Sequence, residues 1–132
     1  MISQAYSELP NECCGLLAGR MEESVNAPKS QVAKVDRCYP LVNAAASPTE
    51  YLSDARSMFE AVRDMRLSRL DLVAVFHSHP TSPPIPSRTD LERNYSPDTP
   101  NFIISLKDKT PEVRAWWLAE KDYREADWRL IG

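Results

Sequence analysis

The stretch from Leu72 to Asp90, LVAVFHSHPTSPPIPSRTD, restricts the possible fold more than any other part of the sequence. Its first five residues are apolar and rich in β-branched side chains, a pattern that predicts a short buried β-strand. Four prolines follow between Pro80 and Pro86. They fix φ and remove backbone donors, so this segment is predicted to be a stiff loop. The chain is therefore expected to leave a buried strand and return to it through a rigid connection.

Two histidines and an aspartate in this stretch suit a zinc ion. His77 and His79 are two residues apart at the end of the predicted strand, where side chains with that spacing point to the same face. Asp90 comes after the loop, three residues beyond Ser87, and this spacing puts both side chains on one side of a helical turn. Catalytic zinc sites commonly have three nitrogen or oxygen ligands and a fourth position for water. His77, His79 and Asp90 are therefore predicted to bind one Zn²⁺ ion.

Each part of this pattern also has a structural explanation. The spacing of Ser87 and Asp90 is that of a capping box at the start of a helix. A histidine at the end of a strand is often a hydrogen-bonded residue of the core or the surface. The combination of both histidines, the rigid loop and the returning carboxylate favours the metal site.

Glu12 is an acidic residue in an unusual position. In the segment PNECCGLLAG it directly precedes Cys13 to Ala18, an apolar run closed by Gly19 that is predicted to form a second buried strand. A carboxylate at the entrance of such a strand must be solvated, paired or functional. Two interpretations stay open: the general base of a hydrolytic site, or an exposed acid between a helix and a strand.

The chain resembles the JAMM (MPN+) family of zinc metalloproteases, in particular its small, single-domain prokaryotic members. That family is marked by a glutamate ahead of a CGLL-like strand and by the motif HxHPx6SxxD. The similarity extends through LVNAAASPTEYLSDARSMFEAVRDMR and NFIISL to most of the chain. It implies an α/β fold, a mixed and curved β-sheet flanked by helices in the layering seen in cytidine deaminases. The residues that match the motifs are Glu12, His77, His79, Pro80, Ser87 and Asp90.

The resemblance implies a role for each of these residues. His77, His79 and Asp90 would hold the zinc ion, Glu12 would act as general base and then general acid, and Ser87 would donate a hydrogen bond to the oxyanion. The implied activity is hydrolysis of the peptide or isopeptide bond after the C-terminal Gly-Gly of a ubiquitin-like protein, of the sulfur-carrier type for so compact a member. Two alternatives remain: a zinc hydrolase of a small amide or amino-acid conjugate, and a non-catalytic scaffold module. The complete set of site residues argues against the scaffold.

The chain is short in two places relative to that family. Only eleven residues precede Glu12, where family members have a strand and a full helix. The sequence is therefore expected to start late, with a sheet edge that is incomplete or covered by another subunit. The segment from Leu91 to Pro100 is also brief, and members that cleave ubiquitin chains carry insertions there. Specialisation for polyubiquitin is therefore not expected.

Charge and composition exclude several other classes. Sixteen Lys and Arg against nineteen Asp and Glu give a net charge of −3, and without a basic stripe no nucleic-acid partner is expected. No apolar stretch approaches the roughly 18 residues of a membrane span, and no secretory signal is recognisable, so a cytoplasmic location is predicted. With 42% apolar residues, residues 1–132 are predicted to form one domain. The three cysteines lack a CxxC spacing and are predicted to be small buried hydrophobes. The oligomeric state is left open.

Hydrophobic periodicity predicts the remaining elements. Apolar spacing predicts a helix from Ile2 to Leu9 that ends at Pro10, and a second from Ala55 to Met65 with Ser53 as its N-cap. Of the neighbours Trp116 and Trp117, one ring is expected in the core and one at the surface, and the alternative is that they line a substrate groove. Extended segments are predicted at Gln31 to Pro40, Leu41 to Ala45, Asn101 to Leu106, Val113 to Ala119 and Trp128 to Ile131, with a solvated turn from Glu120 to Asp127.

Overall fold

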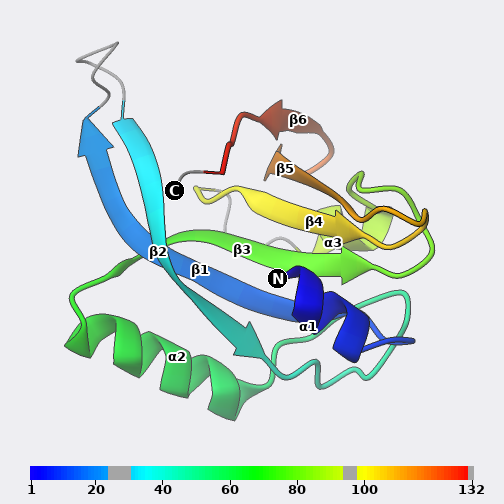
Figure 1. Cartoon of the computed structure of the whole chain (residues 1–132), viewed down its shortest axis with the longest axis horizontal. Helices are drawn as coiled ribbons and strands as arrows, with labels where there is room; N and C mark the ends of the chain where they lie inside the picture. The colour runs from blue at the N-terminus through cyan, green and yellow to red at the C-terminus, as the bar shows by residue number, and fades with distance from the viewer. Residues whose placement is uncertain (24–30, 94–97, 131–132) are drawn as a thin grey trace.

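The computed structural model describes residues 1–23, 31–93 and 98–130 of the chain. The described strands form one six-stranded sheet in the order β2-β1-β3-β4-β5-β6, in which β3 and β4 run parallel and the other neighbours antiparallel (Figure 1). This confirms the predicted α/β class with a mixed sheet. The elements are α1 (Ile2–Ser7), β1 (Cys14–Glu23), β2 (Gln31–Leu41), α2 (Ala55–Leu67), β3 (Asp71–His79), α3 (Arg88–Glu92), β4 (Asn101–Ser105), β5 (Glu112–Leu118) and β6 (Tyr123–Ala126).

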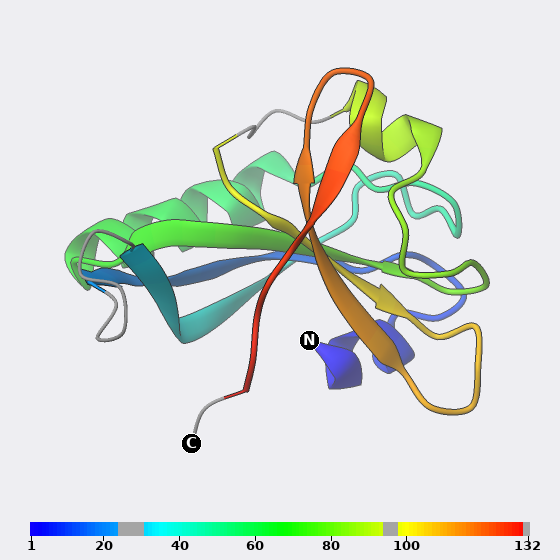
Figure 2. The same cartoon turned by 90° about the horizontal axis from the view of Figure 1, so that it is seen from above.

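Helices cover both faces of the sheet. Figure 2 shows α2 and α3 on one side and α1 on the other. Alternation along the central strand β3 separates the two faces: Ala74 and Phe76 pack with the cluster that includes α1, whereas Val75 packs with Leu16 and the buried side of α2. Because β3 is buried on both faces, its apolar run is nearly continuous. His77 follows Val75 by two positions and therefore lies on the face of α2 and α3.

Helix α2 is amphipathic, with Ala61 and Met65 buried against the sheet. Its N-cap is Asp54, whose carboxylate accepts a hydrogen bond from Ser57 N at 3.0 Å. The prediction of Ser53 as the cap was wrong by one residue. Ser53 instead forms an isolated β-bridge with Asn43, which leaves Asp54 at the position whose side chain reaches the third amide of the helix.

The predictions for the C-terminal segment were wrong. Residues predicted as a solvated turn contain strand β6, and residues 128–130, predicted as part of a strand, have no regular structure, while residue 131 lies outside the described part. β6 is a short, mostly exposed edge strand that gains its stability from backbone pairing with β5 and from cross-strand contacts. Arg114 makes two hydrogen bonds of 2.8 Å to Glu125, and Trp116 contacts Tyr123 edge to face. Such charged edge strands lack the apolar alternation on which the prediction relied.

Three smaller predictions have mixed outcomes. Strand β2 ends at Leu41, so the extended segment predicted from there to Ala45 is a bridge followed by a turn. Cys13 and Cys14 are buried as predicted, but Cys38 is exposed because it lies on the edge strand β2. The tryptophans agree with the prediction, since Trp116 is buried and Trp117 is only half-buried. Among the described helices none is long and apolar enough to cross a membrane.

Candidate metal centre

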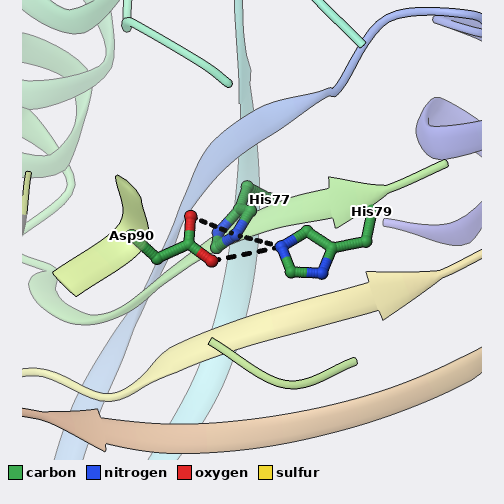
Figure 3. Close-up of side chains that lie close together, drawn as sticks. All are labelled: His77, His79 and Asp90. Atoms are coloured by element: carbon green, nitrogen blue, oxygen red, sulfur yellow. Dashed lines mark hydrogen bonds and ion pairs between the residues drawn. The ribbon is translucent and has the colours of Figure 1, made fainter. Parts of the chain in front are cut away.

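His77, His79 and Asp90 converge on one point at the end of β3. His77 Nε2 lies 3.1 Å from Asp90 Oδ1, His79 Nε2 lies 3.1 Å from Asp90 Oδ2, and the two Nε2 atoms are 3.2 Å apart (Figure 3). The two imidazoles belong to the last three residues of β3, and the carboxylate of Asp90 reaches them from α3. All three residues are buried. The structure therefore brings together the three residues predicted as metal ligands.

The donor set and its spacing fit a zinc ion. Bonds of about 2.0–2.1 Å to a tetrahedral zinc ion place neighbouring ligand atoms about 3.3–3.4 Å apart. In this cluster each imidazole nitrogen lies 3.1 Å from a different oxygen of Asp90, the two nitrogens are 3.2 Å apart, and one ligand atom from each residue lies within 4.8 Å of the others. Two imidazoles and one carboxylate also form a ligand set that is typical of catalytic zinc. The cluster therefore offers the ligand types of a zinc site at approximately the spacing that the ion requires.

Neighbouring groups orient both imidazoles. His79 Nδ1 lies 2.9 Å from Pro83 O, and because a carbonyl only accepts, Nδ1 is the donor. This bond leaves Nε2 as the atom that faces the other two ligands, an arrangement common around metal-binding histidines. The ring of Tyr51 stacks on His77 with centroids 4.8 Å apart. His77 Nδ1 has no hydrogen-bond partner in the part of the chain that the structure describes.

The proline-rich loop is held through its carbonyl groups. Its prolines have no N–H, so the carbonyl oxygens are their only backbone hydrogen-bonding groups. Three consecutive carbonyls, at residues 82–84, each accept a bond from a different side chain. The donors are Ser105 Oγ to Ser82 O at 2.7 Å, His79 Nδ1 to Pro83 O at 2.9 Å and the Trp116 indole to Pro84 O at 2.8 Å. Strands β4 and β5 thereby fix the loop that returns Asp90 to the histidines.

Asp90 serves as a helix cap and a candidate ligand at once. Ser87 Oγ accepts a bond from Asp90 N at 3.1 Å, and Ser87 N donates to Asp90 Oδ2 at 2.9 Å, which completes a capping box at the start of α3. The two interpretations of the SxxD spacing are therefore compatible. Among the described contacts, Ser87 Oγ accepts one hydrogen bond and donates none. Its hydroxyl proton is available to a ligand.

Asp90 and His79 each shift the pKa of the other toward the charged form. Burial alone favours a neutral Asp90, but the positive charge of His77 and hydrogen bonds from His77, His79 and Ser87 N hold the pKa of Asp90 well below its ordinary value. Burial also opposes protonation of His79, yet its bonds to Asp90 and Pro83 outweigh burial and raise the pKa of His79. Asp90 is therefore a carboxylate under physiological conditions. A divalent cation bound here would compete with the proton of His79.

Glu12 is buried next to this cluster. Only 3% of the residue is exposed, so the interpretation as an exposed acid is wrong. Its backbone is held on both sides, because Glu12 N donates to Ser47 O at 2.9 Å and Asn43 Nδ2 donates to Glu12 O at 3.0 Å. Burial raises the pKa of Glu12 to about 8, with His79 acting against the shift and Asp90 and Glu50 adding to it. Within the described residues Glu12 Oε1 has no hydrogen-bond partner, which suits a group that exchanges protons with a ligand.

Two residues that support Glu12 were not found from the sequence. Ser78 lies between the histidines and points to the opposite face of β3, where its Oγ accepts a bond from Cys13 N. Asn43 bonds Glu12 O and Glu50 O through Nδ2 and accepts from two backbone amides through Oδ1. The signal for Ser78 was available, because a polar residue pointing into the core of a buried strand needs a partner. Nothing in the local pattern indicated Asn43.

Comparison with known proteins places this arrangement in a family. The sequence matches the prokaryotic homologues of the JAB domain over residues 1–119, and the chain belongs to that family. The resemblance inferred from the motifs is thus confirmed.

Among the family's characterised members, the chain is 32% identical to the CysO-cysteine peptidase of Mycobacterium tuberculosis over 108 residues, which are 82% of this chain and 68% of that protein. It is 33% identical to the desampylase of Pyrococcus furiosus over 121 residues, covering 92% of this chain and 76% of that protein. A protein of Desulfitobacterium hafniense with a known solution structure shares the fold with a TM-score of 0.80 and 34% identity, over 96% of this chain and 83% of that one. The two named relatives are cleaving enzymes, in agreement with the predicted kind of function.

Proposed function

We propose that this protein is a zinc metallopeptidase that hydrolyses the peptide or isopeptide bond after the C-terminal Gly-Gly of a ubiquitin-like, sulfur-carrier-type protein. The observation that carries the proposal is Glu12, a buried acid with an unpaired oxygen among the described residues, beside His77, His79 and Asp90. The names of the relatives, a CysO-cysteine peptidase and a desampylase, support the substrate class. The proposal treats residues 1–132 as one catalytic domain that acts in the cytoplasm.

The metal would be held by His77 Nε2, His79 Nε2 and a carboxylate oxygen of Asp90. When bound, a zinc ion lowers the pKa of a water molecule from about 15.7 toward about 7 and polarises the scissile carbonyl. The hydrogen bonds of His79 to Pro83 and of Asp90 to Ser87 keep the ligand atoms directed at one point.

Glu12 acts as general base and then as general acid. It takes a proton from the attacking water as the water oxygen bonds to the carbonyl carbon. It then delivers that proton to the departing amine as the carbon–nitrogen bond breaks, so no covalent bond between enzyme and substrate forms. In the metal-free protein burial raises the pKa of Glu12 to about 8, and a cation bound beside it would favour the carboxylate form that accepts the proton of the water. Such catalysis is typically worth roughly 10² to 10⁴ in rate.

Ser87 stabilises the charge that develops on the carbonyl oxygen. A hydroxyl donates one hydrogen bond and accepts two, so Ser87 Oγ can continue to accept from Asp90 N while it donates to the substrate. The capping box fixes the hydroxyl in place before substrate arrives. Loss of one such donor costs about 10² to 10³ in turnover.

The size of the adjoining space favours a slender substrate. A hollow of about 130 Å³ borders Asp90, whereas pockets for small organic ligands commonly measure about 300–1,000 Å³. An extended tail that ends in two glycines needs little width, because glycine has no side chain. Such a tail can approach beside the sheet in the manner of an added strand.

The test uses a ubiquitin-like carrier whose tail ends in Gly-Gly-Cys, with the carrier ending in Gly-Gly as control. Zinc-loaded protein is expected to remove the cysteine, which mass spectrometry detects as the loss of one residue. Glu12→Gln is expected to bind zinc as the wild type does and to lose at least about 10²-fold in rate. An unchanged carrier mass with zinc-loaded wild type contradicts the substrate class, and full activity of zinc-loaded Glu12→Gln contradicts the mechanism. Failure to take up zinc at all would favour a scaffold role.

A further inference from the structure

Asn101, the first residue of β4, has a buried amide without a hydrogen-bond partner. The residue is 4% exposed, and its Nδ2 finds no acceptor among the described residues. A side-chain amide nitrogen offers two donors. A buried donor that stays unpaired destabilises the fold, and nearly all such groups in proteins are paired. A ligand that offers a hydrogen-bond acceptor to Asn101 Nδ2 would therefore be stabilised at this position.

The register of the sheet places Asn101 near the metal centre. β3 and β4 are parallel neighbours, with Val75 opposite Asn101 and His77 opposite Ile103. Paired residues share a face of the sheet, so Asn101 lies on the same face as His77. It precedes the level of His77 by two residues, which corresponds to about 6.6 Å along the strands.

A hollow connects Asn101 with the metal centre. Its lining includes both Asn101 and Asp90, and its walls are largely apolar, formed in part by Leu16, Met58 and Val75, with Tyr51, Ser53 and Arg93 as further polar residues. Asn101 and Asp90 border the same hollow, so a chain segment that fills it can contact both.

We propose that Asn101 binds the substrate, with Nδ2 donating a hydrogen bond to the main-chain carbonyl of the residue directly before the Gly-Gly. This inference rests on the proposed function. In an extended peptide the carbonyls of residues two apart point the same way and lie about 6.6 Å apart. When the carbonyl of the last glycine is at the metal centre, the carbonyl two residues earlier is therefore level with Asn101. The contact recognises the extended main chain of the substrate and does not depend on the side chain at that position.

The experiment compares wild type with Asn101→Leu, which keeps a similar volume and removes the amide. The substrate is the carrier ending in Gly-Gly-Cys, prepared in two forms: one unmodified, and one in which the amide after the residue before Gly-Gly is replaced by an (E)-alkene, which keeps the extended geometry and lacks the oxygen. For wild type, kcat/KM is expected to fall about tenfold with the alkene substrate. Asn101→Leu is expected to lose about tenfold with the unmodified substrate and nothing further with the alkene.

Two further measurements separate substrate binding from a structural role. Asn101→Leu is expected to take up zinc as the wild type does and to unfold at a higher temperature, because it removes an unpaired buried donor. A lower unfolding temperature, a loss of zinc, or additive losses in the four rates would overturn the role of Asn101. Equal kcat/KM for wild type and Asn101→Leu would also overturn it while leaving the proposed function intact. If zinc-loaded wild type cleaves no carrier, the proposed function fails and the inference fails with it.

Discussion

Cys13 and Ser78 exchange two hydrogen bonds across the β1–β3 pair: Cys13 N donates to Ser78 Oγ at 2.8 Å, and Ser78 N donates to Cys13 O at 3.1 Å. Glu12 directly precedes Cys13, and Ser78 stands between His77 and His79. The pair therefore sets the position of the proposed general base relative to two ligands. The Ser78 hydroxyl holds Cys13 from the face of β3 that is opposite the imidazoles.

Replacing Ser78 with alanine is expected to weaken the fold and the reaction together. Ser78→Ala leaves Cys13 N without its acceptor in the core, which lowers the free energy of unfolding by about 1–3 kcal/mol. Hydrolysis should fall more than zinc affinity, because the lost bond holds Cys13, the residue directly after Glu12, whereas the three proposed ligands keep their own contacts. Urea unfolding, zinc titration and carrier cleavage measure the three effects. Ser3→Ala, on the exposed side of α1, is the matched control, and equal stability of the two variants would speak against the prediction.

Replacing Trp116 with phenylalanine is expected to weaken metal binding from a distance. Trp116→Phe keeps an aromatic ring in the core and removes the donor to Pro84 O, so the loop that carries Asp90 is less firmly held. Loss of a group that supports metal ligands typically costs about 10- to 100-fold in affinity, and a value near tenfold is expected here. Competition with a fluorescent zinc chelator measures it. Trp117→Phe, on the other face of β5, should bind zinc as the wild type does, and a similar loss in both variants would rule out the loop as the cause.

Glu12 should make the stability of the metal-free protein depend on pH. Its pKa is raised from 4.5 to about 8 in the folded state, so the folded protein binds more protons than the unfolded chain between these values. The free energy of unfolding therefore falls as pH rises from about 4.5 to about 8, by an amount on the order of 5 kcal/mol. Glu12→Gln should flatten this part of the profile, whereas Glu22→Gln, at an exposed position, should leave it unchanged. Parallel profiles for wild type and Glu12→Gln would show that Glu12 is ionised without penalty.

Zinc binding should release protons and depend on Asp90. The pKa of His79 is raised by its bonds to Asp90 and Pro83, so zinc competes with a proton there and its affinity falls as pH is lowered through the range in which His79 titrates. Titration calorimetry in two buffers of different ionisation enthalpy counts the protons. Asp90→Asn should lower zinc affinity more than about 100-fold, since it removes a ligand rather than a supporting group. Unchanged affinity in Asp90→Asn would place the metal elsewhere.

The convergence of the three proposed ligands was predictable because its geometry is local. A buried strand directs His77 and His79 to one face, and a loop stiffened by four prolines leaves few paths by which Asp90 can return. Ser87 and Asp90 could be placed on one side of a turn for the same reason. The two interpretations of the SxxD spacing needed no choice, since Asp90 Oδ2 accepts from Ser87 N and faces His79 Nε2 at the same time.

Features that depend on pairing between distant segments were harder to predict from the sequence. No local pattern places Glu12 beside β3, and its assignment came from the resemblance to a family. Strand β6 was missed because a charged edge strand is held by backbone bonds to its neighbour rather than by an apolar face. Cys38 was wrongly predicted to be buried for a related reason. The burial of a strand residue depends on the position of the strand in the sheet, which the sequence of that strand does not reveal.

The anchoring of the proline-rich loop has a consequence for how the protein matures. Ser105 and Trp116 hold the loop through bonds that involve no metal, and the strands beneath it pair through backbone hydrogen bonds. Small zinc domains, by contrast, fold only when the ion arrives. Under the proposed function, this chain is expected to fold first and to bind zinc afterwards, so the onset of its activity in the cell would follow the supply of metal rather than the rate of synthesis.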